Sequence, residues 1–292
     1  MRSRSHLYVG EFNRRMILKD YYWFFQSALD DETCDRIIAQ GHERLKEIEE
    51  AQGKKATIAQ VGGRSSVYNH GDINTKKKPR VGTTEQMKAD GIDVSQTYAR
   101  DSYVAFFSED WVYETLHPYL HEANNHSGWN FTLAHSEQTQ FTRYEDGGEG
   151  GEGQFYGWHM DGQWDEYKFF DENNPQHREE AILKDENNNE IMSETGTPVF
   201  VNNTWTTHKE WIGHVRKLSM TVQLTDPDEY EGGLFQIDRG PHFDIERYYT
   251  VREIMQRGSI IVFPSFVYHQ VTPVTKGARE SLVMWSIGPR WK

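Results

Sequence analysis

The spacing of apolar residues changes partway along the chain, from a helical period to an alternating one. Acidic residues at 30–32 mark a helix N-terminus, and apolar residues follow on one helical face, so we predict a helix from there to about Gly53. Apolar residues at helical spacing predict a second helix over 111–124. Residues 20–29 are expected to be extended, and residues 53–98 to form a loop with short elements. The first part of the chain therefore has the pattern of a supporting region.

From about residue 128 onward, apolar and polar residues alternate in short runs that turn residues separate. This alternation predicts strands, most clearly where Leu218, Met220, Val222 and Leu224 precede a turn. The other predicted strands cover residues 138–144, 155–161, 233–237, 258–263, 268–272 and 280–287. Many short strands after two helices predict an α+β, mainly β fold: a double-stranded β-helix (jelly roll) core with N-terminal supporting helices.

We expect one structural unit with two parts. Residues 1–130 are predicted to be an N-terminal helical support region, packed on a jelly-roll core over residues 131–292. A long polar stretch, residues 162–215, breaks the strand pattern and is predicted to be an insertion in this core. The run Asn187-Asn188-Asn189 within it predicts a hairpin, because asparagine favours turns.

Charge and cysteine content narrow the classes of function. The formal net charge of −13 disfavours a nucleic-acid or anionic-membrane partner, since phosphate binding needs a positive field. No apolar run is long enough to span a bilayer, and no apolar segment of a secretion signal follows the basic N-terminus. Cys34 is the only cysteine, so no intrachain disulfide is expected, and it is predicted to be a buried helix thiol. These features predict a cytoplasmic protein.

His-x-Asp occurs three times, at His70-Gly-Asp72, His159-Met-Asp161 and His242-Phe-Asp244. Only the second lies in a predicted strand, and a regular series of further predicted strands comes after it. Side chains two apart in a strand leave the same face, so His159 and Asp161 can close on one cation. A neutral imidazole with a carboxylate suits Fe(II), Mn(II) or Zn(II). The first and third triplets are interpreted as surface loop residues.

A third candidate ligand, His269, lies on the predicted strand 268–272. Arg279 begins the next predicted strand after a turn that contains proline and glycine, and we expect a hairpin that lets both side chains face one cavity. Two histidines and one carboxylate leave three positions of an octahedral cation open, as in non-haem Fe(II) oxygenases. A guanidinium nearby supplies a bidentate partner for a carboxylate, such as that of a keto acid.

With these residues in place, the chain resembles the 2-oxoglutarate- and Fe(II)-dependent dioxygenases, specifically the prolyl 4-hydroxylase-like branch. The resemblance covers roughly residues 136–288. The stretches that carry it are Tyr144 with Gly153 to Asp161, Lys217-Leu218-Ser219 with Leu224 to Gly233, and His269 with Pro273-Val274, Gly277-Ala278-Arg279 and Trp285. The sequence departs from the family in having Leu234-Phe235 after Gly232-Gly233, where relatives often have Glu-Leu. The insertion after Asp161 is also longer than in the family.

The resemblance implies a role for each of seven side chains. Iron would be bound by His159, Asp161 and His269. Arg279 would pair with the distal carboxylate of 2-oxoglutarate and, with the three ligands, forms the predicted catalytic set. Further contacts with the co-substrate or its pocket would come from Tyr144, Tyr156 and Trp285.

The resemblance also implies an activity. The chain would be a dioxygenase, an oxidoreductase that uses O2, Fe(II) and 2-oxoglutarate to hydroxylate a C–H bond and releases succinate and CO2. The implied substrate is a peptidyl proline in a protein or peptide, with ascorbate as the reductant. Alternatives are an oxygenase of the same fold that acts on another amino acid or on nucleic acid, and a non-catalytic jelly-roll binding or structural component of a larger assembly. The acidic charge and the absence of a second arginine in Arg279-Glu280-Ser281-Leu282 disfavour the nucleic-acid enzyme.

Overall fold

The structure is a computed structural model, and it describes residues 20–52, 100–148, 153–162, 165–182, 189–190, 204–240 and 246–291. The predicted loop over 53–98 and the other two His-x-Asp triplets lie outside these residues, as do Asn187 and Asn188 of the predicted hairpin. None of the described helices combines the length and the apolarity needed to cross a membrane.

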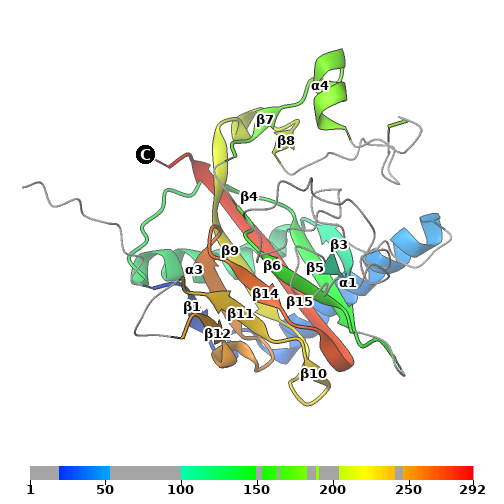
Figure 1. Cartoon of the computed structure of the whole chain (residues 1–292), viewed down its shortest axis with the longest axis vertical. Coiled ribbons are helices and arrows are strands. Elements are labelled where there is room, and N and C mark those ends of the chain that lie inside the picture. Colours follow the sequence, from blue (N-terminus) through cyan, green and yellow to red (C-terminus); the bar gives the residue numbers. More distant parts are fainter. Residues whose placement is uncertain are drawn as a thin grey trace, which may run out of the picture.

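Two antiparallel sheets form the body of the described chain (Figure 1). The larger sheet has the strand order β1 (Trp23–Phe25), β13 (Ile260–Pro264), β9 (His214–Gln223), β15 (Val274–Pro289), β5 (Thr139–Glu145) and β3 (Tyr103–Phe107), and β4 (His135–Ser136) and β10 (Tyr230–Gly232) also pair with β15. The smaller sheet has the order β12 (Tyr248–Thr250), β11 (Phe235–Asp238), β14 (His269–Val271), β6 (Phe155–His159) and β2 (Arg100–Asp101). The predicted mainly β jelly roll is confirmed.

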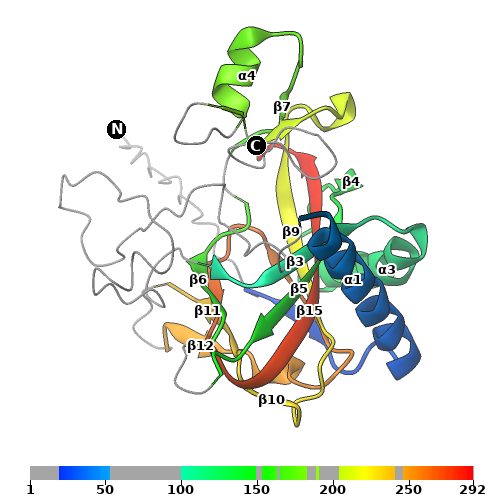
Figure 2. The same ribbon diagram turned by 90° about the vertical axis from the view of Figure 1, so that its right-hand side faces the viewer.

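Two long helices lie on one side of the larger sheet, α1 (Asp31–Gln52) and α3 (Asp110–His126), as Figure 2 shows. The Asp30 carboxylate accepts a hydrogen bond from the Thr33 backbone N–H at 2.8 Å and so caps the first turn of α1. Cys34 and Ile37 of α1 are buried against the sheet, and burial raises the pKa of the Cys34 thiol to about 11. Both predicted helices and the buried thiol are confirmed.

The two faces of the larger sheet have different surroundings. On β15, Leu282 and Met284 point into the apolar core beneath the helices, together with Phe141 of β5. Residues one step along the strands, such as Arg279, therefore point away from the helices towards the smaller sheet. We call the surface of each sheet that faces the other sheet its inner face. A second apolar cluster fills part of the space between the inner faces, and it includes Tyr144, Phe235, Ile237, Phe263, Val267 and Val271.

The N-terminal region contributes strands as well as helices. β1 pairs with β13, β2 pairs with β6, and β3 pairs with β5, so three strands that precede residue 131 extend the sheets. β2 and β3 were not among the predicted strands. The proposed division at residue 130 stays a prediction.

The predicted hairpin between His269 and Arg279 is wrong. β14 pairs with β11 and β6 in the smaller sheet, whereas β15 pairs with β5 and β9 in the larger one. Thr272 and Pro273 between them carry the chain from one sheet to the other. The residues after Asp161 hold β7 (Lys168–Phe169), α4 (Pro175–Ala181) and β8 (Trp205–Thr206), which stand apart from the two sheets in Figure 1.

Candidate active site

The three predicted metal ligands converge on the inner face of the smaller sheet. One donor atom from each of His159, Asp161 and His269 lies within 4.8 Å of the other two. The Asp161 carboxylate places one oxygen 3.5 Å from His159 Nε2 and the other 3.6 Å from His269 Nε2. All three side chains are nearly excluded from solvent. In the described part of the chain, no other group of His, Cys, Asp and Glu side chains meets in this way.

Strand pairing brings the two histidines together. His159 of β6 and His269 of β14 are direct partners in register, and their ring centroids lie 4.1 Å apart. Between this pair and the next one, Val271 with Tyr156, β6 has one more residue than β14. This β-bulge turns Tyr156 to the same face as His159, so that the two rings stack at 3.4 Å.

The hydrogen bonds of both imidazoles leave Nε2 available as a ligand. Nδ1 of His159 lies 2.8 Å from the Gly157 carbonyl oxygen, and Nδ1 of His269 lies 2.9 Å from that of Val267. Because a carbonyl only accepts, each Nδ1 donates and each neutral ring presents the lone pair of Nε2. Burial, aided by the neighbouring His159, lowers the pKa of His269 to about 4, which keeps this ring neutral.

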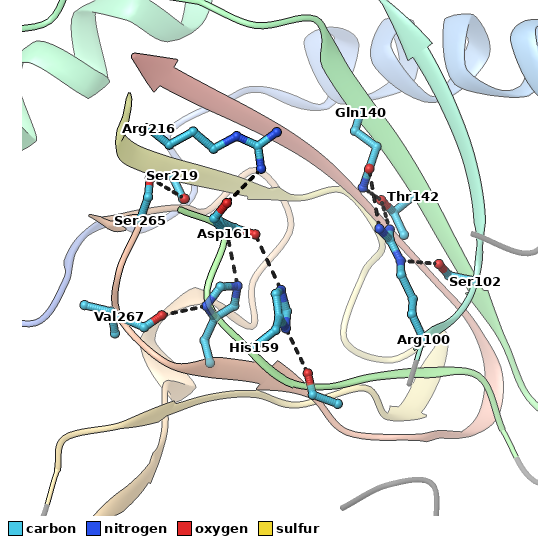
Figure 3. Close-up of polar contacts among 12 residues, drawn as sticks. Arg100, Ser102, Gln140, Thr142, His159, Asp161, Arg216, Ser219, Ser265 and Val267 are labelled. Atoms are coloured by element: carbon cyan, nitrogen blue, oxygen red, sulfur yellow. Dashed lines mark hydrogen bonds and ion pairs between the residues drawn. The ribbon is translucent and has the colours of Figure 1, made fainter. Parts of the chain in front are cut away.

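Asp161 lies in a bend two residues beyond the end of β6, rather than in the strand as predicted. Its position depends on Arg216, which donates from Nη1 to the Asp161 carbonyl oxygen at 2.9 Å (Figure 3). Arg216 also binds both carboxylate oxygens of Glu137. Burial raises the pKa of Asp161, but His269, His159 and Arg216 outweigh it and hold this pKa well below its usual range. The ligand is therefore a carboxylate at neutral pH.

These donors fit the metal that the sequence predicts. Two neutral imidazole nitrogens and one ionised carboxylate form the set that Fe(II) shares with related divalent ions. The chemistry of the set, rather than any bound ion, is the basis of this assignment.

Arg279 fits a carboxylate partner from outside the chain. It lies on β15 directly opposite Tyr144 of β5, and only 2% of it is exposed. Among the described residues, its buried Nη1 has no hydrogen-bond partner and no acid forms an ion pair with it. A buried guanidinium without an anion is costly, so a ligand carboxylate would satisfy it. Gly233 gives the side chain its space, since a Cβ there would lie 2.8 Å from Arg279 Cδ.

The other predicted pocket residues also lie on the inner faces. Tyr144 is buried, and its ring centroid is 5.9 Å from the Arg279 guanidinium carbon. Burial raises the pKa of Tyr144 and of Tyr156, so both hydroxyls are neutral donors. Trp285 packs under Arg216, with the guanidinium carbon 4.2 Å from the ring centroid, and its buried indole N–H has no hydrogen-bond partner among the described residues. Their roles toward the co-substrate stay predictions.

Sequence reasoning missed two arginines of this site. Arg216 continues the alternation of Leu218 and Met220, which would point it under the helices. A bulge in β9 opposite Ser286 and Ile287 turns it to the inner face instead. Arg100 follows a long stretch without periodicity, and no pattern marks it. It enters the site because β2 pairs with β6, where Arg100 is the register partner of Tyr156.

A jelly roll that brings two histidines and a carboxylate together on an inner face has the donor set of mononuclear non-haem metal proteins. The chain belongs to the 2OG-Fe(II) oxygenase superfamily, because the model of that family matches residues 139–287, half of the chain. The predicted membership of this superfamily is thereby confirmed.

Individual relatives match over shorter stretches. A PKHD-type hydroxylase from Azoarcus sp. (strain BH72) is 43% identical over 74 residues, which is 25% of this chain and 30% of the relative. A PKHD-type hydroxylase from Nitrosomonas europaea is 40% identical over 74 residues, with the same two shares. The matched segment thus spans less than a third of either relative, and the hydroxylase names agree with the predicted branch.

Among solved structures, a viral collagen prolyl hydroxylase from Paramecium Bursaria Chlorella virus-1 aligns with 94% of this chain and 99% of its own. The identity is 14% and the TM-score is 0.47.

Proposed function

We propose that this chain is an Fe(II)- and 2-oxoglutarate-dependent dioxygenase that hydroxylates a C–H bond in a protein or peptide. One observation carries the proposal: His159, Asp161 and His269 meet at a common point, on the sheet that faces the buried guanidinium of Arg279. Membership of the oxygenase superfamily supports it. The names of the curated relatives support a hydroxylase, and a peptidyl proline is the target that the sequence resemblance implies.

The residues of this chain would act by holding and orienting. His159, Asp161 and His269 would bind Fe(II), and Arg279 would bind the distal carboxylate of 2-oxoglutarate through charge-assisted hydrogen bonds. Bound together, the metal and the keto acid would supply the oxidising chemistry for an unactivated C–H bond, with succinate and CO2 as by-products. Tyr144 and Tyr156, kept neutral by burial, would donate hydrogen bonds to the co-substrate. Trp285 would exclude water from one side.

Two further parts of the proposal concern the surroundings of the protein. A buried, reduced Cys34 and a chain with no other cysteine fit the reducing conditions of the cytoplasm. We also propose ascorbate as the reductant that maintains iron in its divalent state.

Anaerobic titration tests the proposal. We expect visible absorption from a metal and keto-acid chelate when Fe(II) and 2-oxoglutarate are both added, and succinate release when air is admitted. Asp161→Ala should abolish both, because it removes the ionised ligand, and Asp228→Ala, which changes an exposed acid, should preserve both. Retained turnover in Asp161→Ala would refute the assignment. Absence of any chelate in the unchanged protein would favour a non-catalytic binding component.

A further inference from the structure

Arg100 brings a second guanidinium to the candidate site. Its backbone lies in β2, and its side chain crosses from the smaller sheet to β5 of the larger one (Figure 3). Nε donates to Ser102 Oγ at 2.8 Å, and the two Nη atoms have longer contacts, 3.5 Å to Gln140 Oε1 and 3.3 Å to Thr142 Oγ1. The Nη end of the guanidinium, which is the end suited to a bidentate partner, therefore has only long contacts with these two side chains.

Ring contacts link Arg100 to the proposed metal ligands. The guanidinium carbon lies 4.5 Å from the centroid of the Tyr156 ring, and that ring stacks on His159 at 3.4 Å. Arg100 and Tyr156 are register partners, and partners across two strands point to the same face. Arg100 thus faces the space in which His159 also lies.

Among the described residues, no acid balances the charge of Arg100. Its acceptors Ser102, Gln140 and Thr142 are neutral, as is the Tyr144 hydroxyl beside it, and no acid in the described residues forms an ion pair with it. By contrast, Arg216 is balanced by Glu137, and Arg143, which points to the other face of β5, is balanced by Glu145 and Glu280. Half-buried cations in a protein of net charge −13 are ordinarily paired.

The proposed ligands do not balance Arg100 either. The two positive charges of Fe(II) and the one of Arg279 equal the negative charges of Asp161 and of the two carboxylates of 2-oxoglutarate. One positive charge, that of Arg100, remains in a site of low dielectric constant. An anion is expected there, and the substrate is the component that has not been counted.

We propose that Arg100 binds a carboxylate that the substrate carries close to its reacting carbon. This inference rests on the proposed function and narrows its substrate to molecules that carry a carboxylate near the reacting carbon. Two sources supply such a group beside a proline: an acidic side chain that follows it in a peptide, or the α-carboxylate of the free imino acid, which would replace the protein or peptide of the proposed function. A neutral peptidyl proline would leave the guanidinium without its partner.

Matched probes that differ only in charge test the inference. The pairs are end-blocked peptides with Pro-Glu or Pro-Gln, and free L-proline or L-prolinamide. Their dissociation constants are measured anaerobically, from the change that each causes in the absorption of the Fe(II) and 2-oxoglutarate chelate. The first pair reports on an acidic side chain and the second on a free imino acid.

We expect the unchanged protein to bind the carboxylate member of at least one pair roughly tenfold more tightly, which is the effect of one charge-assisted hydrogen-bonded pair. Arg100→Gln should bring that ratio near one, and Arg100→Lys, which keeps the charge but not the fork, should give an intermediate ratio. Lys46→Gln removes an exposed charge on α1 and should leave the ratio unchanged. A merely structural role of Arg100 would weaken both members of a pair alike.

The outcomes separate this inference from the function on which it rests. A chelate that forms normally, with equal affinity for both members of each pair, overturns the inference alone. A preference that persists in Arg100→Gln also overturns it. If no chelate forms in the unchanged protein, the proposed function fails and the inference fails with it.

Discussion

Gly233 shows how one missing methyl group can serve the candidate site. Its φ is +56°, in the left-handed region that favours glycine. A Cβ at this position would lie 2.8 Å from Arg279 Cδ and 3.1 Å from Val274 Cγ2. The residue thus combines a turn conformation with a close approach to the guanidinium side chain.

Gly233→Ala should therefore weaken co-substrate binding without removing any charge. We expect a rise of roughly tenfold in the 2-oxoglutarate concentration that half-saturates the chelate, because the displaced guanidinium loses one good hydrogen bond. Gly128→Ala is the matched control, since Gly128 has a φ of +74° but no atom within 4 Å of the added methyl. Equal co-substrate affinity in the two variants would contradict the proposed role of Arg279.

Glu280 links the larger sheet to helix α1 and predicts a pH dependence of stability. It accepts hydrogen bonds from His42 of α1, at 2.6 Å, and from Arg143. Burial raises the pKa of Glu280, but His42 and Arg143 outweigh it and lower this pKa below its ordinary 4.5. A lowered folded-state pKa means that the stabilisation is present above pH 4.5 and is lost as the pH falls through the folded-state value.

Glu280→Gln should cost about 1–3 kcal/mol of unfolding free energy at pH 7, because it replaces the buried carboxylate that His42 and Arg143 contact by a neutral amide. It should also flatten the loss of unfolding free energy as the pH falls below 4.5. Urea unfolding at several pH values measures both effects, with Glu50→Gln on the exposed surface of α1 as the control. An unchanged acid dependence would show that Glu280 is not the group responsible.

The sequence could predict some residues of the candidate site and not others. His159, Asp161, His269 and Arg279 could be found because residue type, spacing and order along the chain limit which chemistry they suit. Arg100 could not, since only the pairing of β2 with β6 brings it to the inner face.

At the scale of elements, regular periods were predictable and interruptions were not. The helical period located α1 and α3, and alternation located β5, β9 and β13. Bulges in β6 and β9 shift the faces of the residues beyond them, and neither leaves a clear mark in the polar pattern. Short strands such as β2 contain too few residues to show any period.

The contact between α1 and β5 depends on a small residue in the helix. A Cβ at Gly41 would lie 2.3 Å from Cγ of the Phe141 ring, which no real contact allows. Phe141 is fully buried in the core beneath the helices. The helix can approach the sheet this closely only because position 41 lacks a side chain.

Gly41→Ala should lower the unfolding free energy by about 1–3 kcal/mol, although alanine is the better helix former, because overpacking forces α1 away from the sheet. Thermal and urea unfolding measure the change. Lys46→Ala alters an exposed position of the same helix and should stay within about 0.5 kcal/mol of the unchanged protein. A stabilised Gly41→Ala variant would show that helix and sheet can separate without cost.

At the scale of the whole molecule, each of the two sheets contributes different side chains to the candidate site. The smaller sheet presents His159 and His269, and the larger one presents Arg279. The strand order could not be predicted, because β14 and β15 are neighbours in sequence yet belong to different sheets. A turn with proline and glycine is compatible with a hairpin and with a crossover alike, and only long-range pairing selects between them.

The crossover between β14 and β15 is held in place by backbone hydrogen bonds. Thr272 N–H donates to Leu234, Gly233 N–H donates to Pro273, and Val274 N–H donates to Gln154, each at 3.0 Å. The span from the imidazole of His269 to the guanidinium of Arg279 is thus fixed by the main chain, and not by a flexible loop.

If His269 and Arg279 hold the two ends of the co-substrate as proposed, this fixed span should select keto diacids by their length. Oxaloacetate is one carbon shorter than 2-oxoglutarate, and 2-oxoadipate is one carbon longer. We therefore expect that neither can reach the metal and the Arg279 guanidinium at the same time. Each should bind about tenfold or more weakly in competition for the chelate, the loss expected for one unmade charged contact. Equal binding of all three diacids would mean that the distance between the metal ligands and Arg279 adjusts to the length of the diacid.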